Sequence, residues 1–305
     1  MGLSIIIPAH NEELFLAATL SRIFDVFNNT INLEVIVVNN ASSDKTECIA
    51  SSFGSVKLIN LKNKSTISKA RNIGFNSSSH EVIAFIDADV LITDEWSEAF
   101  FNTISDLQSN PYQITGCRYY LSEKPGWLER SWFGKMKSKN TSYINSGNLI
   151  TTKPVINKIN GFNENLVTGE DVDFCRRANQ SGISININRC FKAHHEGYPK
   201  TITQFLKRER WHGSGDLASF GMFIKSKVAV FSCILTILFL TSFILLLAGQ
   251  YYYGLVAISL FVTLNLYAVH KRFSISTISD YFSLFYLHCI YCFARCTSFF
   301  VKRHR

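Results

Sequence analysis

The sequence predicts an α/β protein: a doubly wound, mostly parallel sheet of Rossmann-like form, followed by a C-terminal transmembrane helical hairpin. Two observations carry this prediction. Up to about residue 226, short β-branched apolar runs alternate with segments of helical periodicity, as in parallel sheets covered by helices. Beyond it, the runs 228–248 and 251–269 contain no charged residue, and each is long enough to cross a hydrocarbon core of about 30 Å.

The first half of the chain is predicted to alternate strands and helices. Four short runs rich in Val and Ile are typical of buried strands. They are 3–7, 33–38, 56–59 and 82–86. A helix is expected after the first strand, with Asn11 as its N-cap and two glutamates in its first turn, where they suit the helix dipole. Further helices are predicted at 67–75 and 93–107.

The second half of this region is less regular. Residues 112–120 alternate like a strand and are interpreted as an edge strand of the sheet, and the polar segment 121–142 is interpreted as a mobile flap over a site. Pro154 suits the first turn of a helix, a helix is expected at 168–178, and 201–211 is a basic amphipathic helix. Short strands are predicted at 146–150, 183–187 and 190–194.

The C-terminal third has the pattern of a membrane anchor. Only Gly249 and Gln250 separate the two apolar runs, and lysines and an arginine flank both ends, which places both ends on the cytoplasmic side. Segment 281–301 carries His288 and Arg295, so an interfacial amphipathic helix fits it better than a third span. The predicted domains are 1–226 (catalytic), 227–270 (transmembrane hairpin) and 271–305 (interfacial helix and basic tail).

Composition and charge narrow the class of protein. The 305 residues suffice for a sizeable core, and a hydrophobic fraction of 47% is high for a soluble protein. The net charge is +8, and the basic residues gather beside the apolar runs, which favours flanks near anionic lipid. No nucleic-acid motif accompanies them, so we expect no nucleic-acid partner. The basic residues that gather beside the apolar runs and in the C-terminal tail are Lys207, Arg208, Arg210, Lys225, Lys227, Lys271, Arg272, Lys302, Arg303 and Arg305.

The eight cysteines are scattered without the paired spacing of metal ligands. Cys289 and Cys292 lie in an apolar segment with no second Cys or His pair nearby. We therefore expect reduced cytosolic thiols, with neither a zinc site nor a disulfide framework. Residues 1–8 resemble a strand and lack a basic start, so no signal peptide is expected.

Two acidic residues follow the strand at 82–86. Because strand side chains alternate faces, Asp87 and Asp89 can point the same way at the open end of the sheet, where ligands sit in α/β folds. Two carboxylates there suit a hard divalent cation that carries phosphate oxygens. The competing interpretation is a plain acidic turn, and the tripeptide alone favours that turn.

Four further polar motifs follow strands or open helices in the same frame. Singly each is a weak signal, but the ordered set is a strong one. The five motifs are Pro8-Ala9-His10-Asn11-Glu12, Asn39-Asn40-Ala41-Ser42-Ser43-Asp44, Lys69-Ala70-Arg71-Asn72-Ile73-Gly74, Asp87-Ala88-Asp89 and Gly169-Glu170-Asp171.

On these motifs, residues 3–216 resemble the inverting glycosyltransferases of family 2, which have the GT-A fold and among which a membrane tail is common. The resemblance implies a nucleotide-sugar donor held by the loops after the first strands and by the Asp-x-Asp turn. The residues implied to bind it are Pro8, Ala9, His10, Asn11, Glu12, Asn39, Asn40, Ser42, Lys69, Arg71, Asp87 and Ala88.

The same resemblance implies a divalent metal, Mg²⁺ or Mn²⁺, that bridges the donor diphosphate. Its implied ligands are Asp87, Asp89 and a histidine of the run 193–197, where we favour His195 over His194 by its spacing to Gly197.

The resemblance also implies that Asp171 is the general base on the acceptor hydroxyl, with Glu170 beside it as a second catalytic candidate. The run 207–213 looks like the family's basic, tryptophan-containing element, which puts Arg208 and Trp211 on the acceptor side, and Trp132 is a further candidate there.

Physical chemistry supports these roles. Charge develops on the leaving diphosphate, and a metal at Asp87 and Asp89, helped by Arg71, can offset it. An acceptor hydroxyl is a poor nucleophile, so a carboxylate must take its proton, and attack opposite the leaving group inverts the anomeric centre. Alternatives remain open: Glu170 and Asp171 as helix-dipole partners, Arg71 as a surface residue, the tryptophans as packing residues, and either histidine as structural.

One departure from the family pattern concerns the nucleotide base. Family members usually have an acidic residue at the position of Asn39 or Asn40, and an amide can both accept and donate. The donor is therefore left open among UDP-, GDP- and dTDP-sugars.

The sequence thus predicts a multi-pass glycosyltransferase of the inner (cytoplasmic) membrane, hexosyltransferase-type, metal-dependent and inverting, whose catalytic domain faces the cytoplasm. It would transfer a sugar to a polyprenyl-linked or glycolipid acceptor in cell-envelope polysaccharide assembly. The alternatives are a non-catalytic membrane scaffold with this fold and a processive synthase, for which two spans are few. A nucleotidyltransferase is disfavoured because its Gly-rich basic entry loop is absent.

Overall fold

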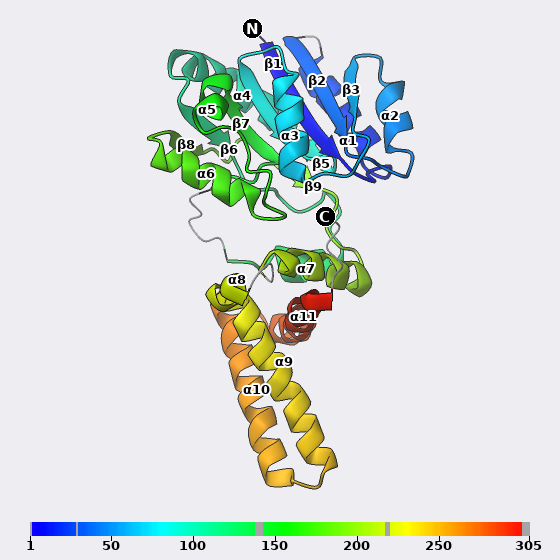
Figure 1. Ribbon diagram of the computed structural model, residues 1–305, viewed down its shortest axis with the longest axis vertical. Coiled ribbons are helices and arrows are strands. Elements are labelled where there is room, and N and C mark those ends of the chain that lie inside the picture. Colours follow the sequence, from blue (N-terminus) through cyan, green and yellow to red (C-terminus); the bar gives the residue numbers. More distant parts are fainter. Residues whose placement is uncertain (1, 29, 138–142, 217–219, 301–305) are drawn as a thin grey trace. The chain divides into compact units, whose positions relative to one another are not determined.

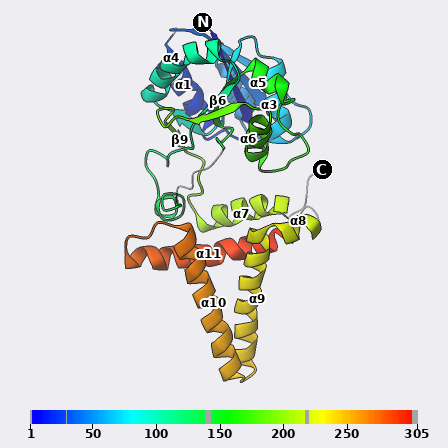
Figure 2. The same cartoon turned by 90° about the vertical axis from the view of Figure 1, so that its left-hand side faces the viewer.

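The computed structural model describes residues 2–28, 30–137, 143–216 and 220–300 (Figures 1 and 2). The chain forms two compact units, Met1–Glu123 with Asn140–Tyr198, and Lys124–Lys139 with Pro199–Arg305. The sequence analysis placed residues up to 226 in the catalytic domain, whereas the structure groups 124–139 and 199–226 with the C-terminal helices. The functional division into domains stays a prediction.

Within its described residues, the first unit is built on a seven-stranded sheet of order β3-β2-β1-β4-β7-β6-β8. The predicted mostly parallel sheet is confirmed: β7 runs antiparallel to β4 and β6, and the other pairs are parallel. The strands are β1 (Gly2–Ala9), β2 (Asn32–Asn39), β3 (Val56–Asn60), β4 (Val82–Ile86), β6 (Gln113–Gly116), β7 (Asn148–Thr152) and β8 (Ser184–Ile187).

Helices cover both faces of this sheet, as its doubly wound pattern predicted (Figure 1). Side chains alternate along β1, so Ile5 and Ile7 join α1 and α4 in one core, while Ile6 joins α5 and α6 in another. The helices are α1 (Leu16–Phe27), α2 (Thr46–Ser52), α3 (Ile67–Asn76), α4 (Asp94–Ser109), α5 (Lys153–Lys158) and α6 (Glu170–Gln180).

Two predictions on elements of the first unit are wrong. Asn11 is not an N-cap: α1 begins at Leu16, and Asn11 has a left-handed φ of 60° and accepts from the backbone N–H of Ser43 at 2.8 Å. The two glutamates expected in the first turn therefore precede the helix. Segment 112–120 does not form an edge strand, because β6 is shorter and lies between β7 and β8.

A small second sheet positions one end of the site. Strand β5 (Val90–Ile92) follows the Asp-x-Asp turn directly and pairs antiparallel with β9 (Ala193–His195). The register sets Val90 opposite His195. The histidine run is therefore brought next to Asp89 although more than a hundred residues separate them in sequence.

The second unit consists of helices (Figures 1 and 2). They are α7 (Ile202–Asp216), α8 (Phe220–Lys225), α9 (Lys227–Leu247), α10 (Tyr251–Arg272), α11 (Ile278–Cys296), a π-helical turn at Glu129–Phe133 and a 3₁₀ turn at Thr297–Phe300. The predicted flap 121–142 is thus partly a helical turn packed in this unit. Its residues 138–142 and the end of the predicted interfacial helix, residue 301, lie outside the described residues.

Two of the described helices, α9 and α10, are long and apolar enough to cross a membrane. Few of their apolar side chains are buried in the protein, unlike those of a soluble core helix, and Leu240, Phe243 and Ile244 are half or more exposed. Helix α11 lies across one end of this pair (Figure 2). All eight cysteines are free thiols.

Candidate active site

A buried arginine links two acidic motifs of the first unit. Arg71 on α3 is 1% exposed, and it donates from Nη2 to Asp87 Oδ1 at 2.7 Å and from Nη1 to Glu170 Oε1 at 2.9 Å. Burial lowers the pKa of Arg71, but the carboxylates of Asp87 and Glu170 outweigh burial and raise it. The alternative of a surface arginine is wrong. The guanidinium is used within the protein, so its first role is to hold these two carboxylates.

Asp87 has a second fixed contact. The Tyr119 hydroxyl donates to Asp87 Oδ2 at 2.7 Å, and burial together with the Asp87 charge raises the pKa of Tyr119 well above its usual value. Gly147 lies against the same carboxylate, because a Cβ there would stand 2.0 Å from Asp87 Oδ2 and 2.1 Å from the Tyr119 hydroxyl oxygen. Only a glycine at 147 leaves room for this arrangement.

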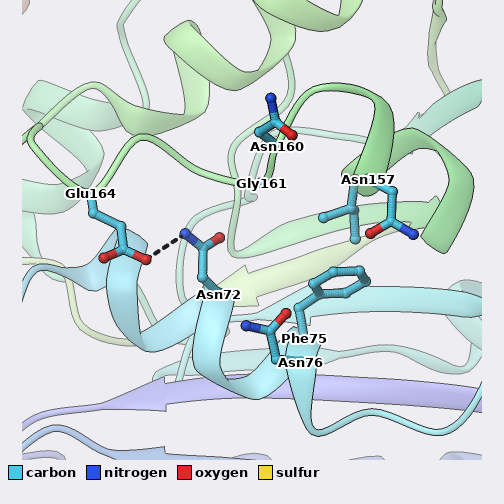
Figure 3. A pocket seen from close by; sticks show the side chains of 8 residues that line it. Asn72, Phe75, Asn76, Asn157, Asn160, Gly161 and Glu164 are labelled. Atoms are coloured by element: carbon cyan, nitrogen blue, oxygen red, sulfur yellow. Dashed lines mark hydrogen bonds between the residues drawn. The ribbon is translucent and has the colours of Figure 1, made fainter.

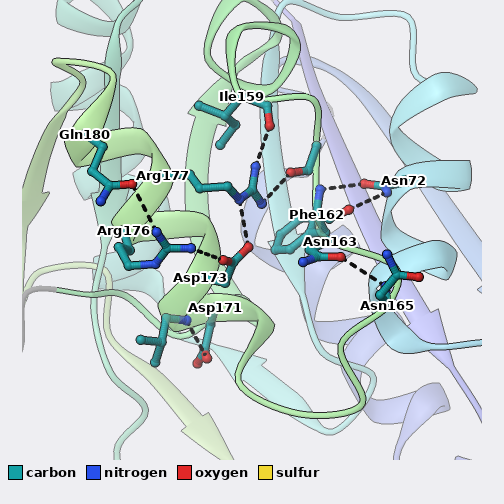
Figure 4. Close-up of polar contacts among 12 residues, drawn as sticks. Asn72, Ile159, Phe162, Asn163, Asn165, Asp171, Asp173, Arg176, Arg177 and Gln180 are labelled. Carbon is teal, nitrogen blue, oxygen red and sulfur yellow. Dashed lines mark hydrogen bonds and ion pairs between the residues drawn. The ribbon is translucent and has the colours of Figure 1, made fainter.

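Asp171 lies in the first turn of α6, beside Glu170. Its Oδ1 accepts from the Val172 N–H at 2.8 Å and its Oδ2 from Asn145 Nδ2 at 3.2 Å (Figure 4 shows the Val172 contact). Burial and the neighbouring Glu170 charge nevertheless raise the pKa of Asp171 to about 6. A carboxylate whose pKa lies this close to neutral pH suits proton transfer better than an ordinary aspartate does.

The loop that leads into α6 is fixed on both sides (Figure 4). Asn72 of α3 donates to the Phe162 carbonyl and accepts from its N–H, both at 2.9 Å. Arg177 of α6 donates to the carbonyls of Ile159 and Gly161 and pairs with Asp173. These contacts set where the start of α6, and with it Asp171, lies against α3.

Asp89 faces the histidine run. Asp89 Oδ2 lies 3.4 Å from His195 Nε2, whereas the His194 ring turns to the Leu121 carbonyl at 2.6 Å. This geometry favours His195 over His194, as the spacing argument did. Glu12 is a third acid here, since burial and the charges of Asp89 and Asp87 raise its pKa to about 8.

The fit of a divalent metal can be judged from these donors. Within the described residues, no group of three or more His, Cys, Asp or Glu side chains is already arranged as a metal site. Neighbouring ligands of Mg²⁺ lie about 3 Å apart when each bond is about 2.1 Å, and the separation between Asp89 and His195 is close to that. A Cβ on Gly197 would stand 1.8 Å from Asp89 Oδ2, so the carboxylate sits in a space kept by glycine. Asp89 and His195 therefore fit a metal, whereas both Asp87 oxygens already accept from protein donors.

The asparagines after β2 are internal. Asn39 is 3% and Asn40 6% exposed. Asn39 donates to Asn60 Oδ1 and accepts from the Ser42 N–H, while Asn40 donates to the Ser65 carbonyl and accepts from the Ser65 N–H. Their amides thus help to shape the loop, and a contact of either amide with a nucleotide base stays a prediction.

The other predicted donor residues are distributed as follows. His10 lies between the Asn40 carbonyl and Lys64 Nζ, each at 2.8 Å, and burial together with Lys64 lowers its pKa. Lys69 is exposed in the first turn of α3. Pro8 and Ala9 end β1, Asn11, Glu12 and Ser42 lie in the adjoining loops, and Ala88 is buried between the two aspartates. Their contacts with a donor stay predictions.

The three residues expected on the acceptor side belong to the second unit. Trp132 is completely buried, with its ring against Phe205 and Phe273, so the alternative that it stacks on an acceptor sugar is wrong and the packing alternative holds. Trp211 is 47% exposed, and Arg208 is paired with Glu209. A role of Arg208 and Trp211 toward an acceptor stays a prediction.

A separate concavity lies between α3 and α5 (Figure 3). It is lined by Asn72, Phe75, Asn76, Ile156, Asn157, Asn160, Gly161 and Glu164. Glu164 accepts from Asn72 at 2.9 Å. None of Glu12, Asp87, Asp89, Glu170 and Asp171 lines it, so it is not part of the candidate active site.

Four residues of the site escaped the sequence analysis: Tyr119, Asn145, Gly147 and Gly197. Tyr119 lies beyond the end of β6, so the strand-like alternation of 112–120 did not predict what it faces, and Asn145 lies in an irregular segment without periodicity. The two glycines carried a weak signal, because Gly147 precedes a short strand and Gly197 closes the histidine run, but their steric role appears only in three dimensions.

Comparison with known proteins agrees with this fold. Residues 4–153 match the model of "Glycosyl transferase family 2", and residues 82–294 match that of "Glycosyl transferase family group 2". Glycosyltransferase AglE of Haloferax volcanii is 26% identical over 70% of this chain and 72% of its own length. Minor teichoic acid biosynthesis protein GgaB of Bacillus subtilis is 28% identical over 39% of this chain, but that match spans only 14% of GgaB.

A solved structure extends the likeness over nearly the whole chain. Mannosyltransferase PcManGT from Pyrobaculum calidifontis, in complex with GDP-Man and Mn²⁺, has a TM-score of 0.58 over 97% of this chain and 86% of its own, at 14% identity. At this identity the likeness concerns the fold. The mostly parallel sheet with its acidic site defines a GT-A glycosyltransferase. The chain belongs to glycosyltransferase family 2.

Proposed function

We propose that this glycosyltransferase moves a sugar, with inversion and with a divalent metal, from a nucleoside-diphosphate sugar to a membrane-associated, lipid-linked acceptor. One observation carries the proposal: Arg71 joins Asp87 of the Asp-x-Asp turn to Glu170, so that Asp171 stands beside the donor end of the site with a raised pKa. A scaffold without catalytic function would have no use for this arrangement.

The carboxylate of Asp171 is the base in this proposal. It accepts the proton of the acceptor hydroxyl while that oxygen bonds to the anomeric carbon of the sugar. The bond from this carbon to the diphosphate oxygen breaks, and its electron pair leaves with the diphosphate. Attack opposite the leaving group inverts the anomeric centre. Asn145 and the Val172 N–H aim the carboxylate by binding one oxygen each.

Arg71 is a positioning residue in this account. Both arms of its guanidinium are engaged, so a direct contact with the donor diphosphate would require the network to open. Instead it fixes the distance between the acidic turn after β4 and the start of α6. Asp89 and His195 would hold the metal, which supplies positive charge for the leaving diphosphate when it is bound.

Membrane association is part of the same proposal. Support comes from α9 and α10, whose length and exposed apolar faces fit a hydrocarbon core, and from the basic residues that flank the pair at both ends. A multi-pass protein of the inner membrane with its catalytic unit on the cytoplasmic side would meet both a soluble donor and a lipid-linked acceptor. Cell-envelope glycan assembly is the proposed setting.

The test is donor turnover by the full chain purified in detergent. UDP-, GDP- and dTDP-sugars are screened with Mg²⁺ or Mn²⁺, and release of the nucleoside diphosphate is measured with a lipid-extract acceptor. We expect release with one donor class and its loss on chelation of the metal. Absence of binding by every donor would favour the non-catalytic scaffold, and release of a long polymer would favour a processive synthase.

A further inference from the structure

A cluster of arginines in the second unit surrounds one buried carboxylate. Glu209 on α7 is 3% exposed, and it accepts from Arg208 Nη1 at 2.6 Å and from Arg295 Nη2 at 3.0 Å. Burial raises the pKa of Glu209, but Arg208 and Arg295 outweigh burial and hold the pKa below its usual range. Arg272, the last residue of α10, adds a third positive charge to the field at this carboxylate.

Arg272 is held by aromatic rings and not by an acid. Its guanidinium carbon lies 4.4 Å from the centroid of the Tyr291 ring and 5.1 Å from that of Trp132, and the Arg295 guanidinium carbon lies 5.1 Å from the same Tyr291 ring. In the part of the chain that the structure describes, no side chain pairs with the Arg272 guanidinium. The rings fix its position without neutralising its charge, so its N–H donors are available to a ligand.

Two further observations point to a missing acceptor. The Trp132 indole N–H is buried without a hydrogen-bond partner among the described residues, although Arg272 stands over the same ring. His212 does not balance the charge of the arginines. Burial together with Arg208 lowers the pKa of His212 to about 4, which leaves its ring neutral at pH 7. Among the described side chains, the cluster therefore sets three guanidinium groups against the one carboxylate of Glu209, and buried polar donors are normally satisfied.

The whole unit shares this imbalance. Residues 124–139 and 199–305 contain 17 Lys and Arg but only 4 Asp and Glu. Three of these four acids are already in ion pairs, Glu129 with Lys200, Glu209 with two arginines, and Asp280 with Lys135. The side chain of the fourth acid, Asp216, is not among those that the structure describes. No described acid of this unit is therefore left for Arg272, which favours an anion from outside the protein.

We propose that Arg208, Arg272 and Arg295 bind the phosphate group of a membrane lipid. A phosphate monoester brings up to two negative charges and several acceptor oxygens, and guanidinium groups match its geometry. A lipid is the favoured source because Arg272 ends a helix fit to cross a membrane, and Trp and Tyr are typical of the membrane interface. The site lies within the second unit and needs no donor, so it stands or falls apart from the proposed transfer reaction.

The test uses the full chain in phosphatidylcholine nanodiscs doped with phosphatidic acid, with bound lipid counted by native mass spectrometry. We expect Arg272→Ala to weaken phosphatidic acid binding by about tenfold or more, since it removes charge-assisted hydrogen bonds. Lys271→Ala is the matched control, because Lys271 is the neighbouring residue, carries the same charge and has an exposed side chain. We expect this variant to change phosphatidic acid binding by less than about twofold.

Two further variants distinguish a phosphate-binding site from a purely structural cluster. Arg272→Lys retains the charge and should bind with intermediate affinity if Arg272→Ala does not fold. Glu209→Gln removes the internal competitor and should strengthen phosphate binding, whereas a purely structural cluster predicts no gain. Equal losses of phosphatidic acid binding in the Arg272 and Lys271 variants would indicate general electrostatic attraction to anionic lipid and would overturn the proposed site. Inorganic phosphate binding as tightly as phosphatidic acid would overturn the lipid source.

Discussion

The two units of this protein contain charge clusters of opposite design. In the first, one buried arginine, Arg71, joins Asp87 and Glu170, and further carboxylates stand nearby. In the second, one buried glutamate, Glu209, joins Arg208 and Arg295, and a further arginine stands nearby. By sequence the first unit has 14 basic and 19 acidic residues, and the second has 17 and 4. In each cluster a single central ion orients its two partners, and the unit around it carries a net excess of the partners' sign.

The largest expected effect comes from removing the central cation of the first unit. Arg71→Met leaves Asp87 and Glu170 without their cationic partner in a largely buried place, so we expect a loss of about 3–5 kcal/mol in unfolding free energy, together with loss of transfer. Thermal unfolding in detergent measures it. Arg22→Met is the control, since its pair with Asp94 is exposed and should contribute no more than about 1 kcal/mol. Equal effects of both variants would contradict the central role of Arg71.

Crowding the same carboxylate should have the next largest effect. Gly147→Ala puts a methyl group about where Asp87 Oδ2 and the Tyr119 hydroxyl now meet, so both must shift at a cost of about 1–3 kcal/mol. We expect weaker donor binding by isothermal titration. Gly54→Ala, where a methyl group meets nothing within 4 Å, is the matched control. Unchanged donor affinity in the Gly147 variant would separate Asp87 from the donor site.

The pH profile of turnover tests Asp171 without any mutation. The base must be a carboxylate, and burial and the Glu170 charge raise its pKa to about 6. Activity should therefore be full above that pH and fall about tenfold per unit as the pH decreases below about 6. Steady-state kcat/KM from pH 5 to 8 measures it, and a flat profile down to pH 5 would argue for another base.

The smallest expected effect is a gain in stability. The folded-state pKa of Asp171 lies above its ordinary value, so folding disfavours the carboxylate, and this cost is present above about pH 6 and vanishes as the pH falls. Asp171→Asn removes the charge and should stabilise the protein at pH 7, on the order of 1 kcal/mol. Asp106→Asn, on the exposed side of α4, should leave the unfolding temperature unchanged. A destabilised Asp171 variant would mean that the pKa is not raised.

Sequence patterns predicted most of the sheet because its strands are short, β-branched and bounded by polar turns. The same patterns placed Asp87 and Asp89 after a strand and Asp171 at a helix start, and the structure joins Asp87 to Glu170, the neighbour of Asp171, through Arg71. They could not show that Asn39 and Asn40 use their amides internally, since burial of a polar group is a matter of tertiary contacts.

The second unit was harder to predict for a related reason. Trp132 precedes the helices it packs against by about seventy residues or more. No local sequence pattern therefore distinguishes a buried tryptophan ring from one that is exposed to bind a sugar. The predicted start of α1 was wrong because Asn11 is of a residue type that often caps helices, but its side chain instead accepts from the loop after β2. The cluster around Glu209 could not be predicted either, because Arg208, Arg272 and Arg295 are far apart in the sequence.

The most direct measurement compares donor binding with transfer in Asp171→Asn. The account predicts that the variant binds the nucleotide sugar with nearly wild-type affinity in titration calorimetry, because Arg71, Asp87 and Glu170 are untouched, while nucleoside diphosphate release falls by about a hundredfold or more. Transfer at the wild-type rate by this variant would contradict the account, because no base would then be needed at this position.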